Sequence, residues 1–172
     1  MNQINNAIGY QGTVSAKLKN SVPVHFHNAG HKALWDSLAM AIAGYDISNR
    51  RPRYFMVLSK TLGSEGFYYE DCLISKVPFV GAIWGNPVEV SDDSTSVRFT
   101  ATVTYKDRRK TIDTSRNSVA VLRMYDVNGN LLAEVEDNIN NDIASIHNSM
   151  ITGVDAIYEW KMTFKNVSVN SN

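Results

Sequence analysis

The sequence has one cysteine, Cys72, so the chain cannot form an internal disulfide. This excludes the small secreted scaffolds that depend on disulfides and fits assembly in a reducing cytoplasm. Two acidic residues, Glu70 and Asp71, precede Cys72 directly, and nearby carboxylates raise the pKa of a thiol. We therefore interpret Cys72 as a small core residue rather than a nucleophile.

The chain also lacks an excess of either charge, since its 172 residues include 17 basic and 17 acidic side chains. No global positive field draws it to nucleic acid or to an anionic membrane. No apolar run approaches the roughly 20 residues of a membrane-spanning helix. The first residues show neither the basic nor the apolar region of a signal peptide. We expect no specific nucleic-acid partner and no membrane span.

Motifs of enzymes and cofactor sites are missing as well. The sequence contains no dinucleotide fingerprint and no phosphate-binding loop, and Gly63–Gly66 lacks the spacing of a nucleophile elbow. Asp126–Asn130 resembles the start of a calcium loop, but Leu131 and Asp137 stand where such a loop needs glycine and glutamate. These absences predict a protein that is not an enzyme and holds no cofactor.

What the chain does have is alternation of apolar and polar residues. Short runs rich in β-branched and aromatic residues, bounded by Gly, Pro, Asn, Asp and Ser, are typical of strands. The runs are Gly12–Asn20, Val22–Phe26, Arg53–Ser59, Val77–Trp84, Ser96–Tyr105, Ser118–Val127, Asn130–Glu136 and Ala156–Phe164. No linker or repeat divides them. We predict a single domain, residues 1–172, built as an antiparallel β-sandwich.

One hairpin and one helix can be placed within this pattern. Asn128-Gly129 separates two alternating runs and predicts a type I′ turn between paired strands. A helix over about residues 29–43 is predicted, with Asn28 as N-cap and Gly44 just after its end. Its apolar stripe is Leu34, Trp35, Leu38, Ala39 and Ile42. A second segment, Asp137–Met150, has helical spacing but is rich in asparagine, which leaves its structure open.

Three of the four histidines, His25, His27 and His31, lie where a strand leads into this helix. On a strand, His25 and His27 point to the same side, which would suit a pair of metal ligands. The simpler interpretation is that Val24 and Phe26 face the core while the histidines face solvent. No Cys, Asp or Glu nearby completes a ligand set, so we expect no metal.

Charge is distributed in four blocks of alternating sign. Residues 1–60 and 98–123 each carry a net +5, and residues 61–97 and 124–172 each carry −5. If the blocks form different surfaces, a positive face of one copy could meet a negative face of the next. If neighbouring strands interleave them, the charges pair within the subunit. The candidate interface residues are Arg50, Arg51, Arg53, Lys106, Arg108, Arg109 and Lys110 on one side, with Glu70, Asp71, Asp92 and Asp93 opposite.

Three stretches together resemble small structural proteins of tailed bacteriophages. His27–Ser59 resembles their N-terminal strand, helix and buried strand, Ser118–Asp137 their middle hairpin, and Ser149–Asn166 their closing strand. The resemblance covers about half of the chain. It implies a β-sandwich virion component, of the tail, neck, fibre-attachment or capsid-decorating type, that has no enzymatic activity.

We therefore expect a virion protein, assembled in the cytoplasm of the bacterial host, that forms a homo-oligomer and docks on other phage structural proteins. Its function would lie in strand edges and loops left incomplete in the monomer. The alternative is a receptor- or carbohydrate-binding module of a fibre, for which Trp84–Pro87 and Phe67–Glu70 could supply aromatic platforms. Core packing is the competing interpretation for Trp84. A metal-dependent enzyme that uses the histidines is the least favoured class.

Overall fold

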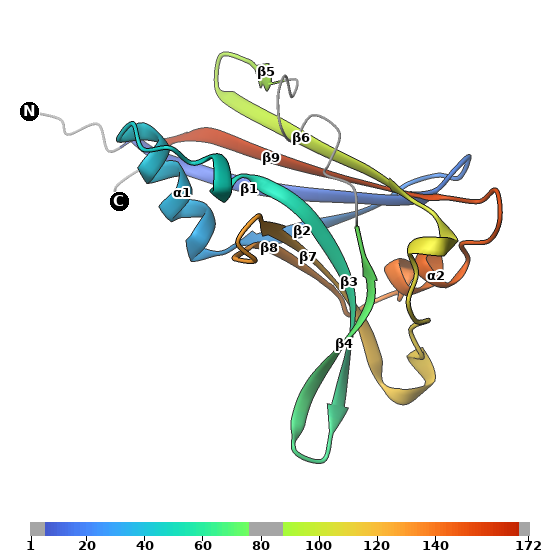
Figure 1. The fold of residues 1–172 in the computed structure, drawn as a ribbon. Helices are drawn as coiled ribbons and strands as arrows, with labels where there is room; N and C mark the ends of the chain where they lie inside the picture. The colour runs from blue at the N-terminus through green and yellow to red at the C-terminus, as the bar shows by residue number, and fades with distance from the viewer. Residues whose placement is uncertain (1–5, 76–87, 169–172) are drawn as a thin grey trace, which may run out of the picture.

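The computed structural model describes residues 6–75 and 88–168, and nine strands run through these residues (Figure 1). The strands are β1 (Asn6–Leu18), β2 (Val24–Gly30), β3 (Pro52–Gly63), β4 (Gly66–Ile74), β5 (Val88–Val90), β6 (Ser94–Val103), β7 (Ser118–Asp126), β8 (Leu131–Asp137) and β9 (Ala156–Ser168). Seven of them overlap the predicted runs. Strands β4 and β5 were not predicted, and the predicted run Val77–Trp84 lies outside the described residues.

All nine strands belong to one open sheet, in the order β4-β3-β7-β8-β2-β1-β9-β6-β5, and every pair in it is antiparallel. The prediction of a mainly β, antiparallel fold is confirmed. The pairing gives one continuous sheet and does not divide the strands into the two separate sheets of the predicted sandwich.

The join at the middle is narrow, because β2 pairs with β8 only through Ala29 and Gly30. We call β4-β3-β7-β8 the β7 half, and β2-β1-β9-β6-β5 the β9 half.

The two halves fold toward each other across this join (Figure 1). Phe55 on β3 and Tyr158 on β9 are five strand positions apart in the sheet. In a flat sheet that separation is about 24 Å, at roughly 4.8 Å per strand. The centroids of the two rings nevertheless lie 5.0 Å apart, and both side chains are buried. The sheet therefore curls strongly enough to enclose one core between its halves.

Strand alternation explains which side chains enter this core. On β9, Tyr158, Trp160 and Met162 are buried, while Glu159 and Lys161 between them are half-buried on the outer face. Strand β7 likewise buries Ala120, Leu122 and Met124. Because side chains of successive residues point to opposite faces, each half has one apolar and one more polar face. The apolar faces meet, and their burial is the main source of stability.

The predicted helix is α1 (Lys32–Ile42), which lies beside the join near β1 and β8 (Figure 1). Gly44 follows its end with φ +81°, as predicted. The predicted N-cap was wrong: Asn28 belongs to β2, and His31 occupies the cap position. The buried residues are Leu34 and Ser37, whereas Ile42 is 88 % exposed. Only part of the predicted apolar stripe faces the sheet, because α1 packs at the margin of the core.

Half-exposed Trp35 still has a packing role on this helix. Its ring meets the edge of the Tyr10 ring, with centroids 5.1 Å apart and planes at 90°. A Cβ atom on Gly30 would lie 3.0 Å from the Trp35 ring, so glycine at that position allows this close approach.

The open question about Asp137–Met150 is answered by a second helix, α2 (Asp142–Asn148). Ile143, Ala144 and His147 on it are buried. The carboxylate of Asp137, itself buried, accepts a hydrogen bond of 2.8 Å from the Ile143 N–H. That bond satisfies one of the N–H groups that the first turn of a helix leaves free, so α2 forms despite its asparagine-rich approach.

The hairpin between β7 and β8 is confirmed, but its turn is not type I′. Only Gly129 has positive φ, +80°, and Asn128 does not. Asp126 closes the loop: its N–H donates to the Asn130 carbonyl, and its carbonyl accepts from the Gly129 N–H. Its buried carboxylate also accepts from the backbone and side-chain N–H groups of Asn130. A three-residue loop with glycine in the left-handed position has this pattern.

Candidate functional site

The histidine segment is placed as the simpler interpretation predicted. His25 and His27 on β2 are exposed, and Val24 and Phe26, which alternate with them, pack against the core. His31 caps α1 and is half-buried. In the described part of the chain, no three His, Cys, Asp or Glu side chains gather as a metal site requires.

Cys72 is fully buried on β4, which confirms its interpretation as a core residue. Burial raises the pKa of its thiol to about 11, and the neighbouring Glu70 charge acts in the same direction. A thiol with this pKa is protonated at neutral pH and a weak nucleophile.

The basic segment Arg108–Lys110 contacts the acidic residues that were expected on the opposite side. Lys110 pairs with Glu70, and Arg109 lies 4.0 Å from Asp71. The Arg108 guanidinium donates to the carbonyls of His147 and Asn148, at 3.0 and 2.8 Å, and so caps the end of α2. These basic and acidic residues therefore lie side by side and not on opposite faces, as in the alternative in which the charges pair within the subunit. The segment holds α2 and β4 together.

The other predicted interface residues lie on separate elements. Arg50 ends a short 3-10 helix before β3 and is half-buried, Arg51 is exposed, and Arg53 lies half-buried at the start of β3. Lys106 is exposed in the 3-10 helix Tyr105–Asp107. Asp92 and Asp93 are exposed in the turn between β5 and β6, where Asp93 accepts a hydrogen bond of 3.1 Å from Ser91.

His147 of α2 is fully buried beside the same basic segment. One ring nitrogen lies 2.7 Å from the Lys110 carbonyl, and the other is buried with no hydrogen-bond partner in the part of the chain that the structure describes. Since a carbonyl can only accept, Nε2 must carry a proton. A second proton on Nδ1 would be buried without an acceptor among the described residues, which favours the neutral ring. Burial lowers the pKa of His147, and the Arg108 charge also lowers it.

We expect stability to fall below about pH 6.5, the ordinary pKa of histidine, because the unfolded chain binds a proton more readily there than the buried ring does. The contribution is complete above that pH and is lost as the pH falls toward the lowered pKa of the folded state. Urea unfolding of wild type and of His147→Gln across this range measures it. The wild type should lose more stability than His147→Gln. His27→Gln, which changes an exposed histidine, should behave as wild type, and equal slopes for all three proteins would contradict the assignment.

Strand β4 is one edge of the sheet, and among residues 6–75 and 88–168 only part of that edge is covered. The Cys72 carbonyl accepts from the N–H groups of Arg109 and Lys110, and Leu73 forms a bridge with Arg108. Among the described residues no strand lies beside the rest of β4, Gly66–Asp71. We call this segment the open edge. With the end of β3 it forms a hairpin that projects from the body of the protein (Figure 1).

The open edge carries unusually exposed aromatic residues. Phe67, Tyr68 and Tyr69 are 61, 47 and 44 % exposed, and Leu62 across the hairpin is 59 % exposed. Cations cover Phe67 and Tyr69 from one side: the Lys60 ammonium and the Arg123 guanidinium each lie 4.4 Å from a ring centroid. These cations also pair with Glu136 and Glu134 on β8.

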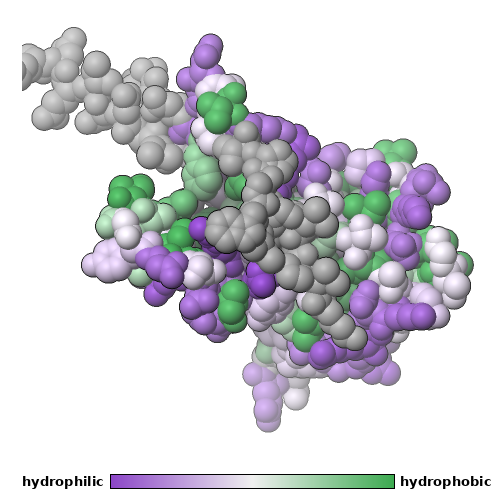
Figure 2. Space-filling view, turned by 45° about the horizontal axis from the view of Figure 1, so that its top comes forward, coloured by the Kyte–Doolittle hydropathy of each residue, from purple (hydrophilic) through white to green (hydrophobic). Residues whose placement is uncertain are grey.

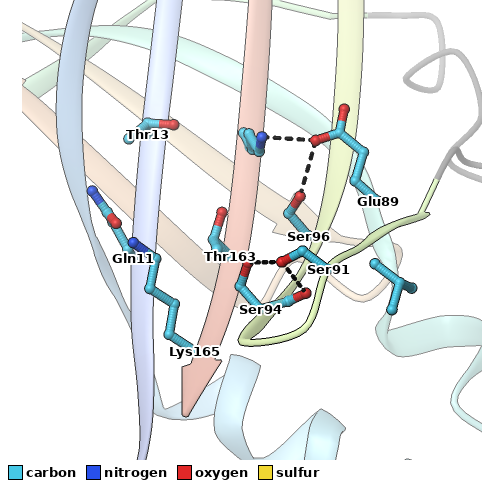
Figure 3. Close-up of a pocket in the computed structure, with 10 residues that line it drawn as sticks. Gln11, Thr13, Glu89, Ser91, Ser94, Ser96, Thr163 and Lys165 are labelled. Carbon is cyan, nitrogen blue, oxygen red and sulfur yellow. Dashed lines mark hydrogen bonds and ion pairs between the residues drawn. The ribbon is translucent and has the colours of Figure 1, made fainter. Parts of the chain in front are cut away.

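A second surface lies on the outer face of the β9 half, where a hollow of about 400 Å³ opens (Figure 3). The strand registers place Gln11, Thr163, Ser96 and Glu89 in one row across β1, β9, β6 and β5. The short side chains Thr163 and Ser96 form its floor, and longer side chains surround them. We call this hollow the polar depression. Its lining residues are Gln11, Thr13, Glu89, Val90, Ser91, Ser94, Ser96, Lys161, Thr163 and Lys165.

Charges in the polar depression are partly neutralised. The Lys161 ammonium lies 2.8 Å from the Glu89 carboxylate, and Arg98 lies 2.9 Å from the same carboxylate. The hydrogen bond from Lys161 is the main reason that the pKa of Glu89 is lowered, and the Arg98 charge contributes. Within the described chain, Lys165 has no ion-pair partner, and its side chain is exposed.

Sequence reasoning identified the aromatic run Phe67–Glu70 but missed the polar depression. The signal for it was present as alternate polar residues, Ser94-x-Ser96 and Lys161-x-Thr163-x-Lys165. It has meaning only once β6 and β9 are known to be neighbours. The other predicted aromatic platform, Trp84–Pro87, lies outside the described residues.

Apolar side chains are scattered over the face of the molecule that Figure 2 shows. Figure 2 shows separate apolar patches among polar side chains on one face of the molecule, and no single broad apolar area. No helix within residues 6–75 and 88–168 is long and apolar enough to cross a membrane.

Comparisons with known proteins leave the family open. No protein-family model, no curated protein and no solved structure matches this chain.

Proposed function

We propose that this chain is a non-enzymatic structural subunit of a tailed-phage particle that associates with copies of itself and with other particle proteins through the open edge of β4. The observation that carries the proposal is the projecting hairpin, with three successive exposed aromatic residues on an unpaired strand edge. In this proposal the two halves, which pack through Phe55 and Tyr158, serve as the two layers of a β-sandwich scaffold.

The physical argument for association rests on the backbone and the side chains together. An unpaired strand edge presents N–H and C=O groups that a strand of another copy can bind. Natural edges avoid such pairing with charge, proline or a covering segment, and the Cys72 end of β4 is covered in this way by Arg108–Lys110. Phe67–Tyr69 lacks such cover among the described residues and offers apolar area in its place.

This proposal gives the charged residues of the predicted interface a smaller role than the apolar residues of the hairpin. Arg109 and Lys110 already pair with Asp71 and Glu70 within the subunit, and exposed pairs contribute only about 0–1 kcal/mol each. The apolar residues of the hairpin supply the affinity in this proposal. The charges of Arg50, Arg51, Arg53, Lys106, Asp92 and Asp93 would act at most on orientation and encounter rate.

Light scattering after size-exclusion chromatography tests this proposal with Phe67→Glu and Tyr69→Glu combined. The new carboxylates would lie near Lys60 and Arg123, so the hairpin should still fold while its apolar surface is lost. We expect light scattering to show a defined oligomer for the wild type and a monomer for the double variant. Circular dichroism should show that the double variant is still folded.

The matched control is Val22→Glu, which changes an 86 % exposed apolar residue between β1 and β2. It should keep the wild-type mass. A wild type that is monomeric at every concentration, or a double variant that still forms the oligomer, would remove the open edge from any self-association.

The alternative function, a receptor- or carbohydrate-binding fibre module, also finds support in the exposed rings. A sugar ring could pack on Phe67 or Tyr69 on the side away from the cation, because among the described residues one cation lies over each ring. Binding of a neutral oligosaccharide by the monomer, lost in the same double variant, would favour this module over a self-associating subunit.

A further inference from the structure

We propose that the polar depression on the β9 half binds an acidic sugar, meaning a hydroxyl-rich ring that carries one carboxylate. The inference does not rest on the assembly proposal, because the open edge belongs to the β7 half and the depression to the outer face of β1, β9, β6 and β5. Its volume of about 400 Å³ falls within the roughly 300–1,000 Å³ of ordinary small-molecule sites.

The shape of the depression comes from the order of side-chain sizes along the rows. Thr163 and Ser96 are short and lie side by side in the pairing of β9 with β6. Gln11 and Glu89 flank them in the same row, and Lys165 lies one row away (Figure 3). A uniformly solvated face would have no such step in height. Here a ligand can rest on Thr163 and on buried Ser96, whose hydroxyl donates to the Glu89 carboxylate at 3.3 Å, between longer polar side chains.

The charged side chains of the lining favour a ligand with one negative charge over a ligand with two. Glu89 occupies Lys161 at 2.8 Å and Arg98 at 2.9 Å, and Arg98 also lies 3.4 Å from Glu159. Of the two lysines in the lining, Lys165 alone has no ion-pair partner within the described residues. A monocarboxylate matches this single ammonium. A phosphate dianion would carry a second charge that Lys165 alone does not balance, in a lining that also holds the Glu89 carboxylate.

The uncharged lining matches sugar hydroxyls. Gln11, Thr13 and Thr163 make no side-chain hydrogen bond within the described residues, so their donors and acceptors are available to a ligand. Ser91 and Ser94 share a hydrogen bond of 2.8 Å, and the Ser91 hydroxyl also lies 3.1 Å from Asp93 and 3.2 Å from the Ser94 carbonyl. Its proton is therefore in use, and its oxygen can still accept from a ligand hydroxyl. None of the lining residues is aromatic, so recognition here depends on hydrogen bonds and one ion pair rather than ring stacking.

The test is a titration of the isotope-labelled protein, followed by NMR chemical shifts, with glucuronate, glucose and inorganic phosphate as separate probes. We expect saturable shifts with glucuronate, centred on Gln11, Thr163 and Ser94. Glucose should bind about tenfold or more weakly, because it lacks the charge-assisted hydrogen bond to Lys165. Lys165→Gln should weaken glucuronate by a similar factor and leave glucose unchanged.

Lys17→Gln is the matched control, since Lys17 lies on the same face of β1 but outside the lining. It removes the same charge and should leave glucuronate binding at the wild-type value. The proposal is overturned if glucuronate gives no saturable shifts, if phosphate binds more tightly than glucuronate, or if Lys165→Gln and Lys17→Gln behave alike. None of these results depends on the oligomeric state, so they leave the assembly proposal untouched.

Discussion

Replacing Phe55 with alanine is expected to lower the free energy of unfolding by about 3–5 kcal/mol, the usual cost of truncating a buried aromatic side chain to alanine. Phe55 has no exposed surface, and its ring packs on Tyr158 at a centroid distance of 5.0 Å. The variant loses both the burial of the ring and the contact that joins the two halves of the sheet. Urea unfolding followed by circular dichroism measures this loss.

Two further measurements test whether this loss of stability comes from the contact between the two halves of the sheet. Ile139→Ala, at an 87 % exposed position, should change stability by less than about 0.5 kcal/mol. A double-mutant cycle of Phe55→Leu with Tyr158→Leu should give a coupling of about 0.5–1.5 kcal/mol, as expected for an aromatic pair in contact. Strictly additive effects would mean that the halves do not pack through these rings.

Arg108→Ala is the second large effect, and we expect it to cost about 1.5–3 kcal/mol. Its guanidinium donates to two carbonyl groups at the end of α2, and hydrogen bonds to charged groups contribute about that much. Without the guanidinium, the carbonyls of His147 and Asn148 lose this partner at a part-buried position. Hydrogen exchange should show weaker protection of the α2 amides, beyond the drop in global stability.

The neighbouring residue provides the control for this prediction. Arg109→Ala removes a side chain that is 54 % exposed and lies 4.0 Å from Asp71, so it should cost no more than about 1 kcal/mol. Equal effects of the two substitutions would show that Arg108 does not cap α2. If Arg108→Ala changes the free energy of unfolding little but abolishes assembly, Arg108 would instead belong to the interface predicted from the sequence.

The sequence predicts those parts of the fold that depend on neighbouring residues. The β7–β8 hairpin was found because its strands alternate and Gly129 stands between them, although the exact turn was missed since Asp126 closes a longer loop. Strand β4 was not predicted, because half-exposed aromatic and acidic residues replace the expected alternation. An edge strand has less surface to bury, so its pattern is weaker.

The stripe of α1 shows a different limit. Helical spacing identified the helix but not how much of its apolar side would be covered. Ser37 is buried because its hydroxyl bonds to the Ala33 carbonyl at 2.6 Å, whereas Ile42 extends past the sheet. Periodicity gives the faces of a helix, and only the tertiary structure determines which of them finds a partner.

The polar depression could not be predicted, because its rows join residues far apart in the chain. Gln11 and Thr163 are opposite each other on β1 and β9, and Ser96 lies on the other side of Thr163. Nothing local specifies that the strand near the start of the chain pairs with the last one. The alternation of residues predicts which side chains of a strand lie on its polar face. Only the strand order determines which of these polar faces become neighbours on one surface.

That same strand order constrains when the protein can fold during its synthesis. Strand β9 is the last strand along the chain, yet it lies between β1 and β6 and pairs with both over most of its length. While the ribosome adds residues at roughly 5–20 per second, β3, β4, β7 and β8 can pair with one another as they emerge. Strands β1 and β6 can pair with β2 and β5, but each lacks its longer partner until β9 emerges, so the β9 half stays in two pieces until then. The nascent chain therefore passes through an interval of several seconds in which half of its sheet is exposed to aggregation and to chaperones.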